Sequence, residues 1–589
     1  MITGRADQAG CRVDFSDFHP QSDARSDIRL LVVSSAIRID NHASIAQACQ
    51  LPPECSIEHL FAAGWRRWGN GLAQRLRGVF GFVLHDPLTG IVYAARDQLG
   101  VSPLFVARHG NALYFGRSSQ ILRAMLQHAL PDDTMMLADF VADACLENER
   151  TFFEGVTRFP AAHWMCIDRA GAQKEKFWSL SDVPTRPAPK QPAEHFRELF
   201  DESVRSCLRS EQTTLLLSGG LDSSALAASA VSLNGTTGIR ALSLTYHETS
   251  AWCDGPHLAA LTGQTGIIPE EVPADRHDPL ADMDFWLRAV DGPHVPRGQS
   301  VAFQLLHKAR RSGSKVVLSG HGGDEIVSFG FGRLNELAKA GQWRKLWGET
   351  AASAGLYGDN RLLHFARYLS HKPQFRPFLT RLSRYTTSAR SVDSGFLSDD
   401  AAAVLPSDRY VHRSVASRLI HDERMLHEEI LSSPIIPTAL EVLALSSQAA
   451  GVDTRLPFYN VDLLEFSISL PSHWKLRNGK SRYILRSAFE ADLPAQTLVR
   501  QDKFDFAPAF IAGLREHREK VLDLTDPAFA DRWSLVNRMR LENARNLLHH
   551  DGTAIGNSDA FFLWRVAVLG MWSSISREPP QASDARLVN

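Results

Sequence analysis

A run of alternating apolar strands and helices in the middle of the chain constrains the fold most strongly. The apolar segment 213–217 is followed by a Gly/Ser turn and then by the helical pattern SSALAASAVSL. Further strands are expected at 239–246, near 267–272 and at 314–319, with a helix at 301–311. Strands that alternate with helices predict a parallel sheet, whose ligands lie at the carboxyl ends of the strands. We therefore expect an α/β domain with its site at that edge.

A proline-rich segment divides the chain into two parts. Residues 182–194, DVPTRPAPKQPAE, hold four prolines and few apolar residues, which is typical of a stiff exposed linker. Before it, short β-rich runs separated by turns predict a sheet-rich first domain, with strands at 29–35, 79–86, 91–96 and 112–116. We place the first domain at 1–180, the linker at 181–194 and the second domain at 195–589, mainly helical in pattern from about 331.

Composition excludes several classes of protein. Hydrophobic residues make up 44% and charged residues 22% of the 589 residues, as in ordinary soluble globular proteins. The net charge of −2 does not favour nucleic acid as a partner. No apolar stretch reaches the roughly 18 residues of a membrane helix and the start lacks a signal-peptide pattern, so we expect no membrane partner and a cytoplasmic location. The seven cysteines lack a C-x-x-C spacing, which indicates neither a disulfide framework nor a thiolate metal site.

The strongest motif is the string S-G-G-L-D-S-S between the first strand of the α/β run and its helix. It comprises Ser218, Gly219, Gly220, Leu221, Asp222, Ser223 and Ser224. The glycines permit a tight turn and close approach of a ligand, while backbone N–H groups, hydroxyls and the helix N-terminus favour an anion. Asp222 would repel a bare phosphate, so we interpret it as a ligand of a Mg²⁺ that accompanies one. The alternative is a glycine turn with a Ser/Asp helix cap.

A second motif, LSGHGGDE at 318–325, also follows a strand about a hundred residues later. In a parallel sheet both loops open at the same edge. Asp222 and Asp324 can therefore face one metal-bound polyphosphate from two sides. The alternative is a Gly-rich turn with solvated acids.

These loops resemble those of the asparagine synthetase family, which carries S-G-G-[LI]-D-S-S and a later L-S-G-x-G-[GS]-D-E. GVDTRLPF at 451–458 is similar to that family's G-V-E-x-R-x-P-F, with Asp453 in place of Glu. Residues 478–480 and 484–486 resemble its N-G-K and I-L-R segments, 500–503 its late R-x-K element with one extra residue, and 76–82 and 96–104 its glutaminase half. The resemblance extends from about 29 to 515. It implies a glutaminase-like α/β sandwich followed by an ATP-pyrophosphatase synthetase domain with a largely helical C-terminal part.

The resemblance implies ATP-dependent amide formation through an acyl-adenylate, with ATP and Mg²⁺ as cofactors. Asp222 and Asp324 would hold the metal. Lys503 would stabilise the transition state, and Asp453 is a further candidate catalytic residue. Lys480, Leu244 and Gly320 join the 218–224 loop as expected nucleotide contacts. His321 stands where asparagine synthetases carry Glu and β-lactam synthetases Tyr; it is a candidate proton acceptor for the amine, with a loop hydrogen bonder as the alternative.

The first domain lacks the residues that hydrolyse glutamine in this family. Such a domain needs a processed N-terminal Cys, whereas the second residue here is Ile2, and Cys11 is not expected to substitute. Ser34-Ser35-Ala36 replaces the Asn-Gly-Glu that holds the glutamine, and the glutamine-binding Asp near Ser56 is missing. We therefore expect a degenerate glutaminase domain and an amine from another source.

An intact ATP site behind a degenerate glutaminase domain resembles the lasso peptide cyclases. In that family an Asp or Glu side chain of a precursor peptide is adenylated, and the peptide's own N-terminal amine closes a macrolactam. We favour this function because of the Gly-His-Gly-Gly-Asp-Glu string and the short first domain. The partners would be the precursor peptide, with a leader peptidase and a leader-binding protein as further candidates. The alternatives are an asparagine or β-lactam synthetase-like ligase that uses ammonia or a small amine, and a non-catalytic nucleotide- or peptide-binding scaffold.

Overall fold

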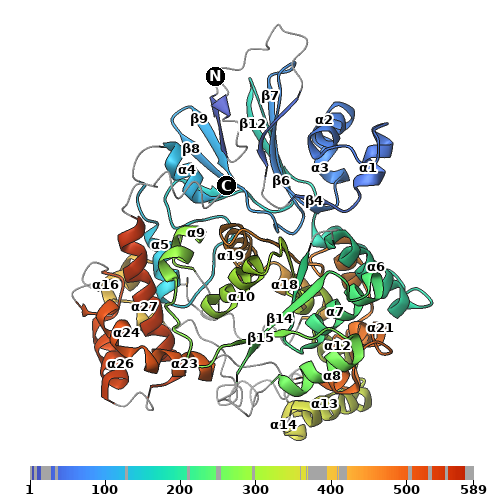
Figure 1. Cartoon of the computed structure of the whole chain (residues 1–589), viewed down its shortest axis with the longest axis vertical. Coiled ribbons are helices and arrows are strands. Elements are labelled where there is room, and N and C mark those ends of the chain that lie inside the picture. Colours follow the sequence, from blue (N-terminus) through green and yellow to red (C-terminus); the bar gives the residue numbers. More distant parts are fainter. Residues whose placement is uncertain are drawn as a thin grey trace.

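The structure is a computed structural model of the chain, and two domains are apparent in it (Figure 1). It describes residues 3–4, 10–14, 28–33, 37–126, 130–208, 212–246, 254–294, 299–357, 360–366, 368, 394–406, 409, 421–501, 507–527, 534–550 and 555–576. Lys503, Ile2 and the Ser34-Ser35-Ala36 segment, on which some of the expectations rest, lie outside these residues.

The first domain is built from two five-stranded antiparallel sheets. One has the strand order β1 (Thr3–Gly4), β2 (Gly10–Asp14), β9 (Ala112–Gly116), β8 (Phe105–His109) and β10 (Val156–Arg158). The other has the order β12 (Gly171–Lys176), β11 (His163–Asp168), β7 (Ile91–Arg96), β6 (Gly81–Asp86) and β3 (Arg29–Val33). The expected strands are thus present, with some boundaries shifted by a few residues.

Side chains of the second of these sheets alternate between two cores. Val83, Val92 and Ala94 point to the other sheet, where they pack with residues such as Phe115. Their neighbours in sequence, including Phe82 and Tyr93, point the opposite way to helices α1 (His42–Ala48), α2 (Ile57–Trp68) and α3 (Leu72–Arg75). This period of two is what a strand buried on both faces requires. The result is the α/β sandwich that the sequence predicts.

The second domain contains a five-stranded parallel sheet. Its strand order is β15 (Glu270–Pro273), β14 (Ile239–Thr245), β13 (Thr213–Leu216), β16 (Val316–Ser319) and β17 (Asp453–Arg455). From β13 the chain proceeds to one side through β14 and β15, and then crosses to the other side through β16 and β17. The boundary between β13 and β16 is therefore the topological switch point, where open α/β sheets bind their ligands.

Helices cover both faces of this parallel sheet. On one face lie α6 (Pro192–Cys207), α7 (Leu221–Asn234) and α8 (Gly255–Thr265). On the other lie α9 (Met283–Val290), α10 (Gln299–Arg311), α19 (Ile435–Ala449) and α27 (Asn557–Ser576). Leu215 and Leu318 face the first group of helices, whereas Leu242 and Val317 face the second. The predicted α/β class is confirmed.

The remainder of the described second domain is mainly helical, as expected. Between β16 and β17 lie α11 (Gly323–Val327), α12 (Gly332–Lys339), α13 (Trp343–Tyr357), α14 (Arg361–Ala366), α16 (Asp399–Val404) and α18 (Glu423–Leu431). After β17 come α20 (Val461–Ser469), α21 (Tyr483–Ala488), α22 (Ala495–Val499), α23 (Ala507–Glu516), α24 (Arg518–Leu524) and α26 (Arg538–His550). Among the described helices none is by itself long and apolar enough to cross a membrane. The pair α18 and α19 meets that test together but is bent by 42°.

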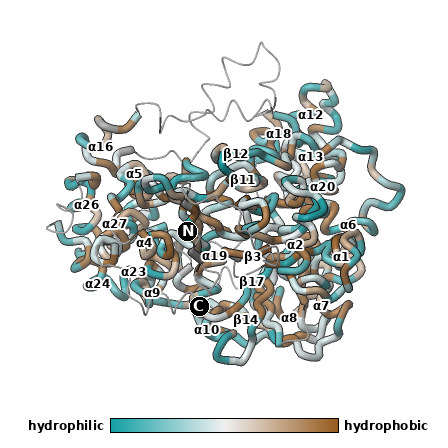
Figure 2. The backbone as a smooth tube through the Cα atoms, turned by 90° about the horizontal axis from the view of Figure 1, so that it is seen from above, coloured by the Kyte–Doolittle hydropathy of each residue, from teal (hydrophilic) through white to brown (hydrophobic). Residues whose placement is uncertain are grey.

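Buried ion pairs join the two domains. Arg158 on β10 donates to both carboxylate oxygens of Glu441 on α19, at 2.6 and 3.0 Å, and both side chains are at most 3% exposed. Burial would raise the pKa of Glu441, but the charge of Arg158 and hydrogen bonds from His294 and Arg158 outweigh it and lower the pKa to about 2. Viewed from above, α19 lies near the middle of the molecule (Figure 2). This helix is therefore anchored to both halves of the protein.

The segment expected to be a linker is held against the second domain. Arg424 on α18 donates to the carbonyl oxygens of Leu180 and Val183, at 2.9 and 2.7 Å, and to the Thr185 hydroxyl at 3.2 Å. Most side chains from 181 to 191 are exposed, as the composition predicts. The linker therefore runs over the surface but along a fixed path.

Removing one partner of the Arg158–Glu441 pair is expected to destabilise the protein strongly. Glu441→Gln leaves a buried guanidinium without its counter-charge, which costs about 3–5 kcal/mol of unfolding free energy. Chemical denaturation measures this loss. The ionised carboxylate stabilises the fold fully above the ordinary pKa of 4.5, so the difference between the two proteins should shrink as the pH falls from 4.5 towards about 2.

The matched control is an exposed ion pair in the first domain. Lys174 Nζ lies 3.8 Å from Glu149 Oε2, and both side chains are about half exposed. Lys174→Ala should change the unfolding free energy by less than about 1 kcal/mol. Equal losses in the two variants would mean that the buried pair does not stabilise the interface.

Candidate active site

The loop that follows β13 folds back onto the first turn of α7. Gly219 has a φ of +65°, and a Cβ there would lie 3.0 Å from the Cβ of His257. The backbone N–H of Ser218 donates to Ser223 Oγ at 3.2 Å. Ser224 is fully buried, and its hydroxyl has no hydrogen-bond partner among the described residues. The loop is therefore a tight turn that leads directly into a helix N-terminus, where anions are favoured.

The second loop, 319–325, lies in contact with the first. The parallel register aligns Leu216 at the end of β13 with Ser319 at the end of β16. A Cβ on Gly320 would come within 2.8 Å of Ser223 N, and one on Gly323 within 2.4 Å of Asp222 Cγ. No other residue fits at these two positions without displacing the first loop. The expectation that both loops meet at one sheet edge is therefore borne out by the geometry.

Asp222 and Asp324 converge on one buried cation, Arg482. Arg482 Nη1 lies 2.8 and 2.7 Å from the two carboxylate oxygens of Asp222 and 2.7 Å from Asp324 Oδ1. The Arg482 side chain is only 6% exposed, against 19% and 16% for the two acids. The sequence analysis did not identify this arginine.

The two carboxylates fit the chemistry of Mg²⁺. This ion is bound by one or two protein carboxylates and takes its other ligands from water and substrate phosphates. Among the described residues no group of three or more His, Cys, Asp or Glu side chains is arranged for a metal. Asp222 and Asp324 are therefore suited to a metal that arrives with a polyphosphate and are too few to bind one tightly alone.

Two further arginines shape the chain beside the first loop. Arg500 Nη2 lies 2.7 Å from Asp254 Oδ1, and its Nη1 lies 3.4 Å from the carbonyl oxygen of Gly219. Arg486 donates to the carbonyl oxygens of Ser481, Leu498 and Arg500, each at 2.8 Å. These bonds fix the path of the backbone up to Gln501. The expected catalytic Lys503 comes two residues later, outside the described residues.

Three other predicted residues lie around the loops. His321 is exposed on the second loop; its backbone N–H donates to Ser319 Oγ at 3.3 Å, and its ring centre lies 6.0 Å from that of Tyr459. Leu244 is partly buried on β14. Lys480 lies on β19 (Lys480–Ser481), which pairs with β18 (Leu476–Arg477). Their roles stay predictions.

Asp453 lies at the amino-terminal end of β17, whereas the two loops follow the carboxyl ends of β13 and β16. It pairs with Val316, the first residue of β16, whereas the second loop follows Ser319 at the other end of that strand. Asp453 Oδ2 is 2.7 Å from Arg455, and Asp453 Oδ1 is buried without a hydrogen-bond partner among the described residues. The structure therefore does not bring Asp453 to the other predicted site residues.

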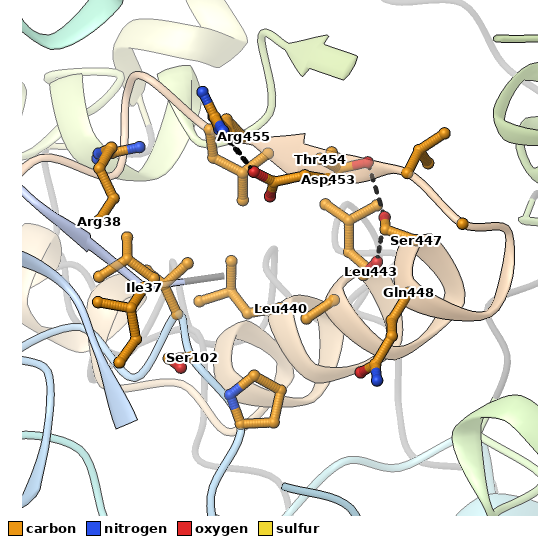
Figure 3. Close-up of a pocket in the computed structure, with 17 residues that line it drawn as sticks. Ile37, Arg38, Ser102, Leu440, Leu443, Ser447, Gln448, Asp453, Thr454 and Arg455 are labelled. Carbon is orange, nitrogen blue, oxygen red and sulfur yellow. Dashed lines mark hydrogen bonds and ion pairs between the residues drawn. The ribbon is translucent and has the colours of Figure 1, made fainter. Parts of the chain in front are cut away.

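Asp453 instead lines a cavity between the domains (Figure 3). The cavity has a volume of about 280 Å³ and lies between Ile37 and Arg38 of the first domain and residues of α19 and β17. Arg38 is buried, and its Nη1 lies 2.8 Å from Cys207 Sγ. None of the residues that line this cavity belongs to the two loops.

Comparison with known proteins agrees with the two-domain organisation. Residues 195–573 match the asparagine synthase family, and residues 53–178 match the glutamine amidotransferase domain. The chain is 26% identical over 569 residues to the putative asparagine synthetases [glutamine-hydrolyzing] of Mycobacterium tuberculosis H37Rv and Mycobacterium bovis, covering 89% of this chain and 80% of each relative. It is 22% identical over 462 residues to asparagine synthetase [glutamine-hydrolyzing] 3 of Bacillus subtilis, covering 74% of this chain and 68% of the relative.

Gly323→Ala should disable the site without unfolding the protein. The new Cβ would occupy the space of the Asp222 carboxylate and push it out of line with Asp324. A misplacement of about 1 Å in a catalytic group can cost roughly a hundredfold in rate. ATP turnover and thermal unfolding together measure the effect. Gly348→Ala in α13 is the control, because a Cβ there meets nothing within 4 Å; if both substitutions leave turnover unchanged, the close contact of the loops is not required.

Proposed function

The chain belongs to the asparagine synthase family, and on that premise we propose that it uses ATP to activate a peptide carboxylate for attack by an amine. Matching to this family extends over residues 195–573, and the activity of the family is ATP-dependent carbon–nitrogen ligation. The observation that supports the proposal best is the contact between the 218–224 and 319–325 loops. It brings the carboxylates of Asp222 and Asp324 to the same nitrogen, Arg482 Nη1, at the topological switch point of the sheet.

The proposed reaction has two steps. A carboxylate oxygen attacks the α-phosphorus of ATP, and the bond from that phosphorus to pyrophosphate breaks, giving an acyl-adenylate. The amine nitrogen then attacks the acyl carbon, loses a proton and expels AMP. Mg²⁺, when bound, neutralises charge on the departing pyrophosphate.

This chain's residues have distinct tasks in the scheme. Asp222 and Asp324 would hold the metal. The N–H groups at the start of α7 would donate to phosphate oxygens. We assign Lys503 to the charge that develops on the tetrahedral intermediate and His321 to the proton of the amine.

The cysteines of the first domain are unsuited to hydrolyse glutamine for the amine. Cys11 lies between the two sheets with no exposed surface, and burial raises the pKa of its thiol to about 12. Burial also raises the pKa of the other described first-domain thiols, Cys49, Cys55, Cys145 and Cys166. A thiolate is the nucleophilic form, so none of these groups is activated.

The substrate that we propose is a precursor peptide. Adenylation of an Asp or Glu side chain and attack by the peptide's N-terminal amine would close a macrolactam ring. A nucleophile held on the same molecule has a high effective concentration, which removes the need for a supply of ammonia. A leader peptidase and a leader-binding protein are the proposed partners.

A second candidate is the synthesis of asparagine from aspartate. It is supported by the names of the relatives, which are asparagine synthetases [glutamine-hydrolyzing]. Assays with aspartate plus ammonia and with a peptide that carries a free N-terminus and an acidic side chain distinguish the two. Mass spectrometry would detect asparagine in the first case and loss of water from the peptide in the second.

Carboxylate-dependent ATP–pyrophosphate exchange tests the common first step. Asp222→Asn and Asp324→Asn should each reduce exchange by at least a hundredfold, because each removes one of the two charged metal ligands. Circular dichroism would establish that both variants fold. Near-normal exchange in either variant at saturating Mg²⁺ would contradict the metal assignment, and absence of exchange in the unaltered protein with every carboxylate tried would favour a non-catalytic scaffold.

Added glutamine should not accelerate the reaction, and the reaction should not depend on Cys11. Cys11→Ala should leave turnover per folded molecule unchanged, because the thiol is buried and protonated. Product formation is measured with ammonia, with glutamine and with the peptide amine alone. Release of glutamate that disappears in Cys11→Ala would overturn this interpretation of the first domain.

A further inference from the structure

A single buried guanidinium neutralises the two acids of the proposed metal site. Arg482 Nη1 lies within 2.8 Å of three carboxylate oxygens, two on Asp222 and one on Asp324. The guanidinium carries one positive charge, and the two acids together carry two negative charges. The Arg482 side chain is only 6% exposed. Without Arg482 the two acids would repel each other across the contact of the loops.

The backbone holds Arg482 firmly in this position. Its φ of +51° is in the left-handed region, which costs a non-glycine residue about 1 kcal/mol or more and persists only where the surroundings impose it. Its carbonyl oxygen accepts from the N–H groups of Leu485 and Arg486, at 3.1 and 3.2 Å. The guanidinium also lies over the ring of Phe329, 5.5 Å from its centre. The position of the cation is therefore a built feature of the fold.

Arg482 has unused capacity to bind an anion. A guanidinium has five N–H donors, and the contacts with the two acids involve Nη1. Its Nε is buried and has no hydrogen-bond partner among the described residues. An unsatisfied buried donor is costly, and a phosphate oxygen is a partner of the right charge.

We propose that Arg482 is the resident cation of this site: it keeps Asp222 and Asp324 paired in the free protein, excludes free divalent cations, and releases the acids only to a metal that arrives with a polyphosphate. The identity of the polyphosphate as ATP rests on the proposed function; the exclusion of free metal does not.

The exchange of partners explains why both ligands are needed. A free divalent ion would have to displace a buried, doubly hydrogen-bonded cation and leave it without a counter-charge, which is strongly unfavourable. A metal bound to polyphosphate supplies an anion for the displaced guanidinium. Metal and nucleotide should therefore bind with positive coupling, typically 5- to 150-fold, and Arg482 is the residue that provides it.

Mn²⁺ without nucleotide is the probe for this proposal. Free Mn²⁺ is measured by electron paramagnetic resonance while the full chain is titrated. Arg482→Gln should bind Mn²⁺ at least about tenfold more tightly than the unaltered protein, because two acids are freed. The gain should disappear in the double variant Arg482→Gln/Asp324→Asn. With ATP present the order should reverse, and Arg482→Gln should hold Mn²⁺ less tightly than the unaltered protein.

Arg477→Gln is the matched control. Arg477 lies on β18, five residues before Arg482, and is exposed, with its guanidinium 5.3 Å from the centre of the Tyr483 ring. Its substitution should leave Mn²⁺ binding unchanged. If Arg482→Gln does not fold, Arg482→Met serves instead, because it keeps an unbranched side chain but removes the charge that pairs the two acids, and it should also allow tighter Mn²⁺ binding.

Unchanged Mn²⁺ affinity in a folded Arg482 variant, without nucleotide, would overturn the proposal. So would an equal gain in Arg477→Gln. If the unaltered protein shows no ATP–pyrophosphate exchange but the Mn²⁺ results are as expected, the proposed function fails and the role of Arg482 stands.

Discussion

The site depends on one constraint, the parallel pairing of β13 with β16. Their register aligns Leu216 with Ser319, so the loops that follow leave the sheet side by side. The contact is so close that Gly320 and Gly323 have no room for a side chain against the first loop. Because the loops meet there, carboxylates about a hundred residues apart in the sequence can share one cation. If either strand lay elsewhere in the sheet, Asp222 and Asp324 would be too far apart to bind one metal ion together.

The first domain contributes to this arrangement through its contact with α19. Arg158 anchors α19 through Glu441, and the chain then runs from α19 into β17, the edge strand beside β16. A buried ion pair in the interface thus helps to position the sheet that carries the site. Arg424 fixes the segment that joins the two domains to the surface of the second domain.

The sequence predicts most of the fold and the two acids of the cation site, but not the arginine that lies between them. Alternation of strands and helices identified the parallel sheet, and the position of each motif after a strand was enough to bring Asp222 and Asp324 together. It could not identify Arg482, which is 260 residues from Asp222 and reaches it through a left-handed backbone that no local pattern indicates. Nor did it show that the motif containing Asp453 forms the three-residue strand β17. Without that register, Asp453 could not be placed at the amino-terminal end of β17, away from the two loops.

A buried chain of hydrogen-bonded polar groups also fixes the second loop, through the carbonyl oxygen of Glu325. Lys475 Nζ lies 3.1 Å from His427 Nδ1, and His427 Nε2 lies 2.7 Å from the carbonyl oxygen of Glu325. Burial, followed by the charge of Lys475, lowers the pKa of His427 well below its usual value, so the ring is neutral. An ammonium can only donate, so Nδ1 accepts and the proton is on Nε2, which donates to Glu325. Glu423 lies 3.7 Å from the ammonium and supplies its counter-charge. One tautomer of a buried imidazole therefore holds the loop of Asp324 in place while Arg482 holds its carboxylate from the front.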